Sequence, residues 1–166
     1  NLTIGKKKYI DVEAEMEDIR SRLEALQQEL VGLTDRDAEA FEPLSRAYGL
    51  PKETEEQRIE KERVMEKALY EASVVPLQIM KTVFRVMEDL EVLGEKGSRL
   101  AVSDVGVAVL FARAALEGAS LNIYINTQLM KNREQAERLN KESDELIAEA
   151  GRLQEKIYTG VLAKIR

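Results

Sequence analysis

The feature that most constrains the fold of this chain is a nearly uncharged stretch from Ser103 to Asn126. Apart from Asp104 in its first turn, only Arg113 and Glu117 are charged, and no proline interrupts it. Alanine and glycine recur along it, so neighbouring helices can approach closely. Because a helix without a polar face is normally surrounded by other helices, we predict an all-α fold. The expected architecture is a bundle of about five to six helices around a buried central helix over about 103–130.

The same stretch is about long enough to cross a bilayer. Arg113 and Glu117 lie in its middle, however, and each would cost about 2.5–3.5 kcal/mol at the centre of a membrane helix. The segments on either side are highly charged and amphipathic. We therefore predict a helix buried in protein and no membrane contact.

Composition narrows the chemistry further. The 166 residues are enough for one domain with a substantial core, and we treat 1–166 as a single helical domain. Cysteine and histidine are both absent, which excludes disulfides, thiol nucleophiles and Cys/His metal sites. No spacing indicates a carboxylate metal site, so we predict no metal and no separate cofactor. The net charge of −6 argues against general nucleic-acid binding. No secretory signal is recognisable, and the cytoplasm is the expected compartment.

Helical periodicity extends over most of the remaining sequence. A heptad-like seam predicts a first helix of about 24 residues, and Thr34 fits an N-cap for a second helix that contains Pro43. Thr54 with Gln57 forms a capping box for a third, and Pro76 is expected to break or bend it. The seam consists of Val12, Met16, Ile19, Leu23, Leu26, Leu30 and Leu33.

The ends of the apolar stretch carry its polar groups. Ser103 and Asp104 can cap the first turn of this helix. Asp104 and Asn122 are 18 residues apart, so they face the same way about 27 Å apart along one helix. A long ligand, or an antiparallel copy of the helix, could connect them. Asn122 and Asn126 form an i,i+4 pair that suits a planar heterocycle, although a polar contact between helices is the commoner role for such a pair.

Another polar group lies near the start of the chain. Lys6, Lys7 and Lys8 precede Tyr9. Such a charge run is either a solvated cluster at a helix start or an anchor for an anionic ligand.

Several segments together resemble the family of formiminotetrahydrofolate cyclodeaminases and methenyltetrahydrofolate cyclohydrolases. The segments are TIGKKKY (3–9), LTDRDAEAF (33–41), AYGLPK (47–52), the VVPLQIM stretch around Pro76, SDVGVA (103–108) and EGASLNIYIN (117–126). Two features depart from the family pattern. In the family a Pro-x-Pro-Gly-Gly-Gly-Ser segment usually precedes the first of these pieces. This sequence starts just after that point, and we expect the native protein to carry further residues before Asn1 that complete the folate site. Gly97-Ser98 also stands where Gly-Asn is typical.

The resemblance implies a helical, homodimeric enzyme of one-carbon tetrahydrofolates. The first expectation is cyclodeamination of 5-formiminotetrahydrofolate to 5,10-methenyltetrahydrofolate with release of ammonia, and the alternative is hydrolysis of the methenyl form to 10-formyltetrahydrofolate. Asp104, Lys6 and Tyr9 are the candidate catalytic residues, and Ser103, Asn122 and Asn126 are the candidates for substrate binding. A non-catalytic helical scaffold is a third possibility, which the heptad seam alone supports equally well.

Overall fold

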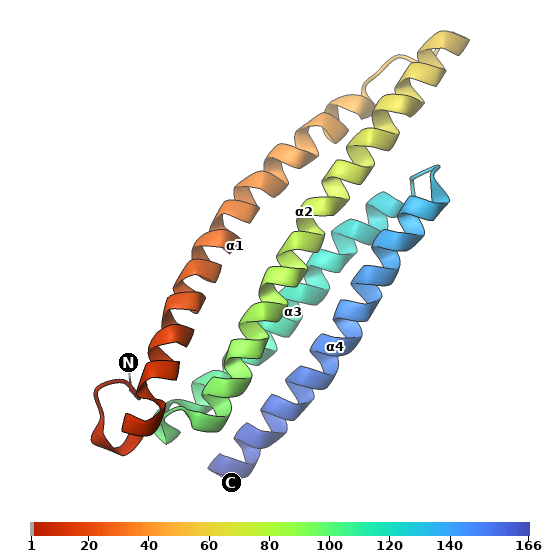
Figure 1. The fold of residues 1–166 in the computed structure, drawn as a ribbon. Helices are drawn as coiled ribbons and strands as arrows, with labels where there is room; N and C mark the ends of the chain where they lie inside the picture. The colour runs from red at the N-terminus through yellow and green to blue at the C-terminus, as the bar shows by residue number, and fades with distance from the viewer. Residues whose placement is uncertain (1) are drawn as a thin grey trace.

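The computed structural model describes residues 2–166 as four long helices (Figure 1). They are α1 (Glu13–Tyr48), α2 (Glu55–Lys96), α3 (Val102–Thr127) and α4 (Arg133–Ile165). Two short 3-10 turns, η1 (Lys7–Val12) and η2 (Arg99–Ala101), precede α1 and α3. Residues 2–166 contain no β-strand, and the all-α prediction is confirmed. There are fewer long helices than the five to six expected, because two of the predicted breaks are absent.

The first absent break is at Thr34. Its hydroxyl donates to the Leu30 carbonyl at 3.1 Å, in the manner of a residue inside a helix, and it caps nothing. The predicted N-cap is therefore wrong. The reason is that the apolar face of α1 continues from Leu33, before Thr34, to Leu44 and Ala47 after it, and all three are buried. The predicted capping box of Thr54 and Gln57 is present at the start of α2, and the side chain of Asn132 caps α4.

The second absent break is at Pro76, which lies inside the continuous helix α2. Proline has no N–H, so the carbonyl four residues earlier, that of Ala72, loses its intrahelical donor. The side-chain amide of Asn126 on α3 donates to this carbonyl at 3.2 Å. A residue from the neighbouring helix thus replaces the missing hydrogen bond, and α2 continues through the proline.

This replacement predicts a coupling between Asn126 and Pro76. We expect Asn126→Ala to lower the free energy of unfolding by roughly 1–3 kcal/mol, because it leaves the buried Ala72 carbonyl without a donor. In a Pro76→Ala background the new backbone N–H supplies that donor, so the same substitution should cost clearly less. A double-mutant cycle from urea unfolding measures the difference. Asn122→Ala, exposed one turn earlier on α3, is the matched control and should change stability by less than about 0.5 kcal/mol. Equal costs in the two backgrounds would contradict this role of Asn126.

The central helix of the chain is α2, which packs against each of the other three long helices. Helix α3 packs on α2 and α4, and Val109, Leu116 and Ile123 are fully buried on that side. Its opposite side is exposed: Phe111 is 73% and Leu121 67% accessible. The prediction that α3 is the buried central helix is therefore wrong within a single chain, because α1 packs along α2 and leaves this side of α3 uncovered. Among residues 2–166 no helix is both long and apolar enough to span a membrane.

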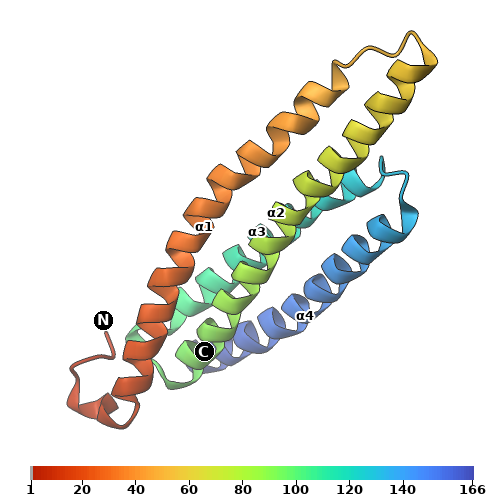
Figure 2. The same ribbon diagram turned by 45° about the horizontal axis from the view of Figure 1, so that its top comes forward.

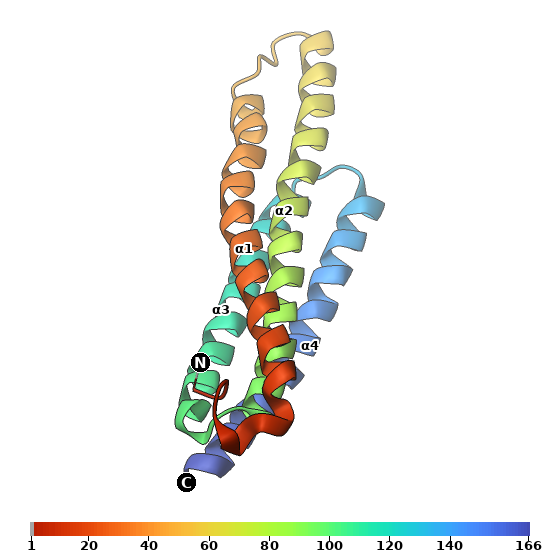
Figure 3. The same cartoon turned by 60° about the vertical axis from the view of Figure 1, so that its left-hand side comes forward.

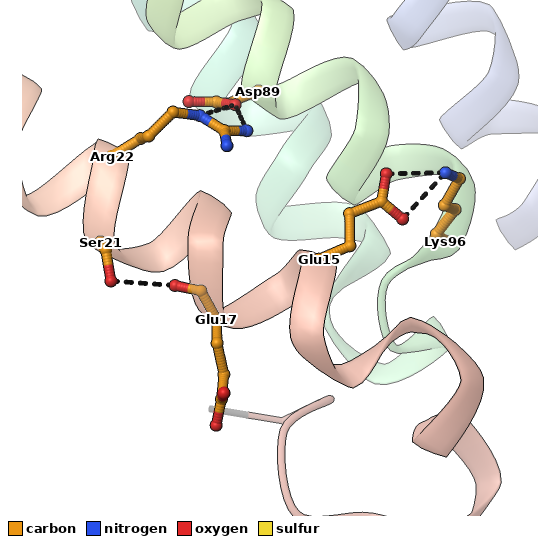
Figure 4. A network of polar contacts seen from close by, with 6 residues as sticks. All are labelled: Glu15, Glu17, Ser21, Arg22, Asp89 and Lys96. Atoms are coloured by element: carbon orange, nitrogen blue, oxygen red, sulfur yellow. Dashed lines mark hydrogen bonds and ion pairs between the residues drawn. The ribbon is translucent and has the colours of Figure 1, made fainter.

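Polar contacts fix the position of α1 along α2 (Figure 4). The Arg22 guanidinium donates to one carboxylate oxygen of Asp89 through Nε at 3.1 Å and through Nη2 at 2.5 Å. Lys96, at the end of α2, binds both carboxylate oxygens of Glu15 at 2.7 and 2.9 Å. Because Asp89 is only 7% exposed, water screens its pair with Arg22 less than a surface ion pair.

The register fixed by these contacts determines where the ends of the helices lie. The connection between α1 and α2 projects beyond the connection between α3 and α4 (Figures 1 and 3). At the opposite end, the N-terminal segment lies close to the connection between α2 and α3 (Figure 2). The candidate site is at this second end.

Tyr124 links α3 to α4, and its ionisation at alkaline pH is expected to lower the stability of the fold. Its hydroxyl donates to Asp144 at 2.6 Å, and burial together with this contact raises the pKa of Tyr124 from 10.0 to about 12. The phenol is therefore held protonated in the folded state, and its stabilising contribution is present below pH 10 and is lost as the pH rises through 12.

We expect the wild type to lose stability relative to Tyr124→Phe between pH 10 and pH 12, measured by urea unfolding at intervals of pH. Tyr48→Phe, on exposed α1 surface, should follow the wild type, and a constant offset of Tyr124→Phe at all pH values would contradict the prediction.

Candidate functional site

The candidate site begins where the N-terminal segment returns to the α2–α3 connection. Gly5 turns the segment with a φ of +75°, a conformation that favours glycine. The Ser98 N–H then donates to the Thr3 hydroxyl oxygen at 2.9 Å, and the Arg99 N–H donates to the Tyr9 hydroxyl oxygen at 3.4 Å. Two consecutive backbone amides before α3 are thus bound by side chains from the N-terminal segment.

The connection itself is tightly built. A Cβ atom on Gly97 would lie 2.4 Å from the Leu93 carbonyl oxygen, so a larger residue would displace the backbone here. The next residue, Ser98, is only 5% exposed, and its side-chain oxygen accepts a hydrogen bond from the Leu100 N–H at 3.3 Å. Thr3, its partner, is 8% exposed. This arrangement fixes the backbone that leads directly into the first turn of α3.

A pocket of about 360 Å³ opens beside this connection. Asp104 is the only charged residue among the described residues that line it, and the hydroxyls of Thr3 and Ser98 lie in the same lining. The remaining lining residues are Leu2, Leu90, Leu93, Gly97, Ala101, Val105 and Ala108. One carboxylate in a mostly apolar pocket suits the transfer of a single proton, or the stabilisation of a cationic group on a bound ligand.

Tyr9 contributes a second proton-carrying group at the edge of this site. Its hydrogen bonds with Ser98 and with the Arg99 backbone, together with the positive charge of Lys8, lower the pKa of the phenol from its ordinary value of 10.0. The Lys8 ammonium lies 5.4 Å from the centre of the Tyr9 ring. A phenol with a lowered pKa releases its proton more readily, which is what a proton donor needs at neutral pH.

The predicted catalytic and capping residues differ in their positions relative to the pocket. Asp104 lines the pocket, whereas Tyr9 lies outside its lining and accepts a hydrogen bond from the Arg99 N–H. Lys6 is exposed, and its backbone carbonyl accepts a hydrogen bond from the Tyr9 N–H at 2.9 Å. Ser103 is exposed next to Asp104. The prediction that Ser103 or Asp104 caps the helix is wrong: the N-cap of α3 is Ala101, without a side-chain hydrogen bond. The reason is that η2 runs directly into α3, and Ser98 caps that turn.

The two asparagines lie at the far end of α3, with Asn122 about 27 Å and Asn126 about 33 Å from Asp104 along the helix axis. Asn122 is exposed, and Asn126 is buried against the Ala72 carbonyl. One chain therefore does not bring them to the Asp104 pocket. The structural role of Asn126 corresponds to the polar contact between helices that the sequence also allowed.

Sequence reasoning missed Thr3 and Ser98. Their hydrogen bond joins residues that are 95 positions apart, and no local spacing reveals such a contact. The local signal for Ser98 is the Gly97-Ser98 pair directly before the most apolar helix. The connection there is short and lies against the core, so its polar groups need hydrogen-bond partners. Among residues 2–166 no cluster of three or more acidic side chains is arranged to hold a metal ion.

The profile of a protein family described as Formiminotransferase-cyclodeaminase matches residues 1–145. The chain belongs to this family. A methenyltetrahydrofolate cyclohydrolase of Methylorubrum extorquens is 42% identical over 165 residues, which cover 99% of this chain and 79% of that relative. A formimidoyltransferase-cyclodeaminase of Mus musculus is 28% identical over 149 residues, 90% of this chain and 28% of the longer mouse protein.

A solved structure extends the family relationship to the fold. The crystal structure of formiminotetrahydrofolate cyclodeaminase from Thermotoga maritima superposes with a TM-score of 0.85 at 27% identity, covering 99% of this chain and 78% of that one. The resemblance drawn from the sequence segments is therefore confirmed at the level of the family.

Proposed function

We propose that this family member acts on one-carbon tetrahydrofolates as a methenyltetrahydrofolate cyclohydrolase. The observation that carries the proposal is the 42% identity to the Methylorubrum extorquens cyclohydrolase over 99% of this chain. The sequence segments alone put cyclodeamination first, and this relative reverses the order. The single carboxylate in the Asp104 pocket is compatible with the reaction, which needs positioned proton transfer.

In this reaction, water attacks the methenyl carbon held between N5 and N10. Asp104 accepts a proton from the attacking water, and a tetrahedral carbon with a hydroxyl group results. The bond from this carbon to N5 then breaks and N5 receives a proton, while the hydroxyl gives its own proton to the group that protonated N5 and becomes the formyl carbonyl on N10. Tyr9, with its lowered pKa, is our candidate donor of that proton. One proton is released overall, and the cationic methenyl group of the substrate becomes neutral.

Cyclodeamination is the second candidate, supported by the match to the Thermotoga maritima cyclodeaminase. Here N10 attacks the formimino carbon of 5-formiminotetrahydrofolate, loses its proton, and ammonia leaves with protons supplied at the site. The same tetrahedral carbon forms between N5 and N10, so the same two side chains could serve. The two reactions differ only in the group that attacks or leaves.

The test follows the ultraviolet absorbance of the methenyl group from each substrate separately. A cyclohydrolase should remove the absorbance of 5,10-methenyltetrahydrofolate faster than buffer alone, with 10-formyltetrahydrofolate as product. Appearance of the absorbance from 5-formiminotetrahydrofolate, with release of ammonia, would make cyclodeamination the activity instead. If neither substrate reacts faster than in buffer, the proposed function is wrong. Asp104→Asn protein purified in the same way controls for contaminating enzymes.

We also propose that the protein is a homodimer joined through the outer face of α3. The residues of this face are Val107, Phe111, Ala114, Gly118, Leu121 and Ile125, all of them exposed in the single chain. They are uncharged and follow one another at alternating intervals of four and three, the spacing of a helix–helix seam. Large contiguous apolar surfaces of this kind mark protein interfaces.

The order of side-chain sizes on the outer face favours a second copy of the chain as its partner. Two large residues, two small ones and two large ones follow in turn, so the pattern is the same when it is read backwards. An antiparallel copy would pair Ala114 with Gly118 at a close crossing and would match large residues at both ends. A two-fold axis requires such self-complementarity. This pairing would bring Asn122 of the partner subunit to about 9 Å from Asp104 along the helix axis, close enough to contact the same folate.

A further inference from the structure

A second pocket, of about 250 Å³, adjoins the Asp104 pocket. It lies between α1 and the N-terminal segment, and its apolar part is formed by Ile4, Met16, Ile19, Leu23 and Leu93. Thr3 and Leu93 line both pockets, so the two are neighbours, and we call them together the groove. The volume of the Asp104 pocket falls near the lower end of the roughly 300–1,000 Å³ usual for small-molecule sites, and that of the second pocket falls below it, whereas the two volumes together lie within that range.

The rim of the second pocket is polar and carries one cation. Arg20, Glu24 and Gln27 follow one another on the exposed side of α1. Arg20 pairs only loosely with Glu24, at 3.8 Å, and both side chains are largely accessible to water. The guanidinium is therefore available to a ligand carboxylate, and Glu24 is the group that competes for it. Such a pocket suits an aromatic or aliphatic body that ends in an anionic group.

Tetrahydrofolate combines an aromatic body with an anionic end in this way. Its reduced pterin is joined to an aminobenzoyl ring that carries glutamate, and N5 and N10 lie at the junction. A folate that places its methenyl carbon beside Asp104 must therefore send the aminobenzoyl-glutamate arm out of that pocket. The adjoining pocket is apolar where the ring would lie and cationic where a carboxylate would end.

We propose that the pocket lined by Arg20 and Leu23 binds the aminobenzoyl-glutamate arm of the folate, with the Arg20 guanidinium on a carboxylate. This inference rests on the proposed function. The ring packs on Leu23 and Leu93, both half-buried in the free protein. In a protein with a net charge of −6, an anionic arm needs such a local cation. Glu24 weakens the contact because it neutralises Arg20.

The test uses two substitutions with opposite expected effects. Arg20→Gln should raise KM for 5,10-methenyltetrahydrofolate roughly tenfold, in line with the loss of one charged hydrogen bond at an exposed site. Glu24→Gln should lower the same KM about two- to threefold, because the competing carboxylate is gone. Neither variant should change kcat. With the analogue 5,10-methenyltetrahydropteroate, which lacks glutamate, both variants should match the wild type. Arg36→Gln, an exposed arginine on the same helix away from the groove, is the matched control.

A binding measurement separates failure of this inference from failure of the proposed function. Ligand-detected NMR should show that the wild type binds p-aminobenzoylglutamate more tightly than p-aminobenzoate, and that Arg20→Gln removes the difference. If the wild type turns over neither folate, the proposed function fails, and this experiment still decides whether the groove binds the arm. If Arg20→Gln behaves as wild type with the glutamate-bearing substrate and with the fragment, the arm does not bind here, whatever reaction the protein catalyses.

Discussion

Replacing Asp104 by asparagine is expected to lower kcat by roughly 10²–10⁴, the usual contribution of a general acid or base. Asparagine has nearly the same size but neither carries charge nor accepts a proton at neutral pH. Folate affinity should change much less, because the side chain keeps its hydrogen-bonding oxygen. The measurement is the methenyl absorbance assay under saturating substrate, together with KM.

The fold should tolerate this change. Asp104 is exposed in the first turn of α3 and makes no capping hydrogen bond, since the N-cap is Ala101. Its favourable interaction with the helix dipole is worth about 0.3–1 kcal/mol. Asp35→Asn, an exposed carboxylate on α1, is the matched control and should keep full activity. Wild-type kcat for a folded Asp104→Asn protein on both 5,10-methenyl- and 5-formiminotetrahydrofolate would remove Asp104 from the mechanism.

The second large effect is expected at the outer face of α3. Phe111→Lys should raise the dimer dissociation constant by at least about 100-fold, because it buries an ammonium in an apolar seam where the pairing places Leu121 of the partner subunit. Sedimentation at micromolar concentration should show a dimer for the wild type and a monomer for the variant. Helicity should stay the same, since Phe111 is 73% exposed within one chain and makes little contact with its own core.

Val31→Lys is the control for this substitution. Val31 is also an exposed apolar residue, on α1, and lies outside the outer face of α3. This variant should sediment like the wild type. A wild type that is monomeric at micromolar concentration, or a Phe111→Lys protein that is still a dimer, would show that another surface, or none, joins the copies.

Local sequence signals predicted the helix ends that depend on local chemistry. The capping box of Thr54 with Gln57 is present as expected, because each of its hydrogen bonds is made within three residues. Pro76 shows the limit of such signals. Its effect on α2 depends on a donor 50 positions along the sequence, Asn126, and a rule about proline alone predicts a break.

The candidate site likewise contains residues that the sequence predicted and residues that it did not. Asp104 was found because a carboxylate is conspicuous in the most apolar helix, and Tyr9 was found from the family resemblance. Thr3 and Ser98 were missed because only folding brings the N-terminal segment to the α2–α3 connection. The sequence also could not predict that the outer face of α3 is exposed. Apolar side chains of the same kinds pack against the chain's own core and against another subunit, so their pattern does not distinguish the two.

Helix α1 packs chiefly on α2 and carries at its start the segment that binds the amides of Ser98 and Arg99. A fluctuation that lifts α1 from α2 would therefore also withdraw Thr3 and Tyr9 from the α2–α3 connection. Such partial openings are part of the native ensemble, and their populations follow their own free energies. The Arg22–Asp89 contact opposes this opening although it lies outside both pockets (Figure 4). The fraction of molecules with an assembled site therefore depends on how often α1 is docked on α2, although the other end of α1 projects away from the site.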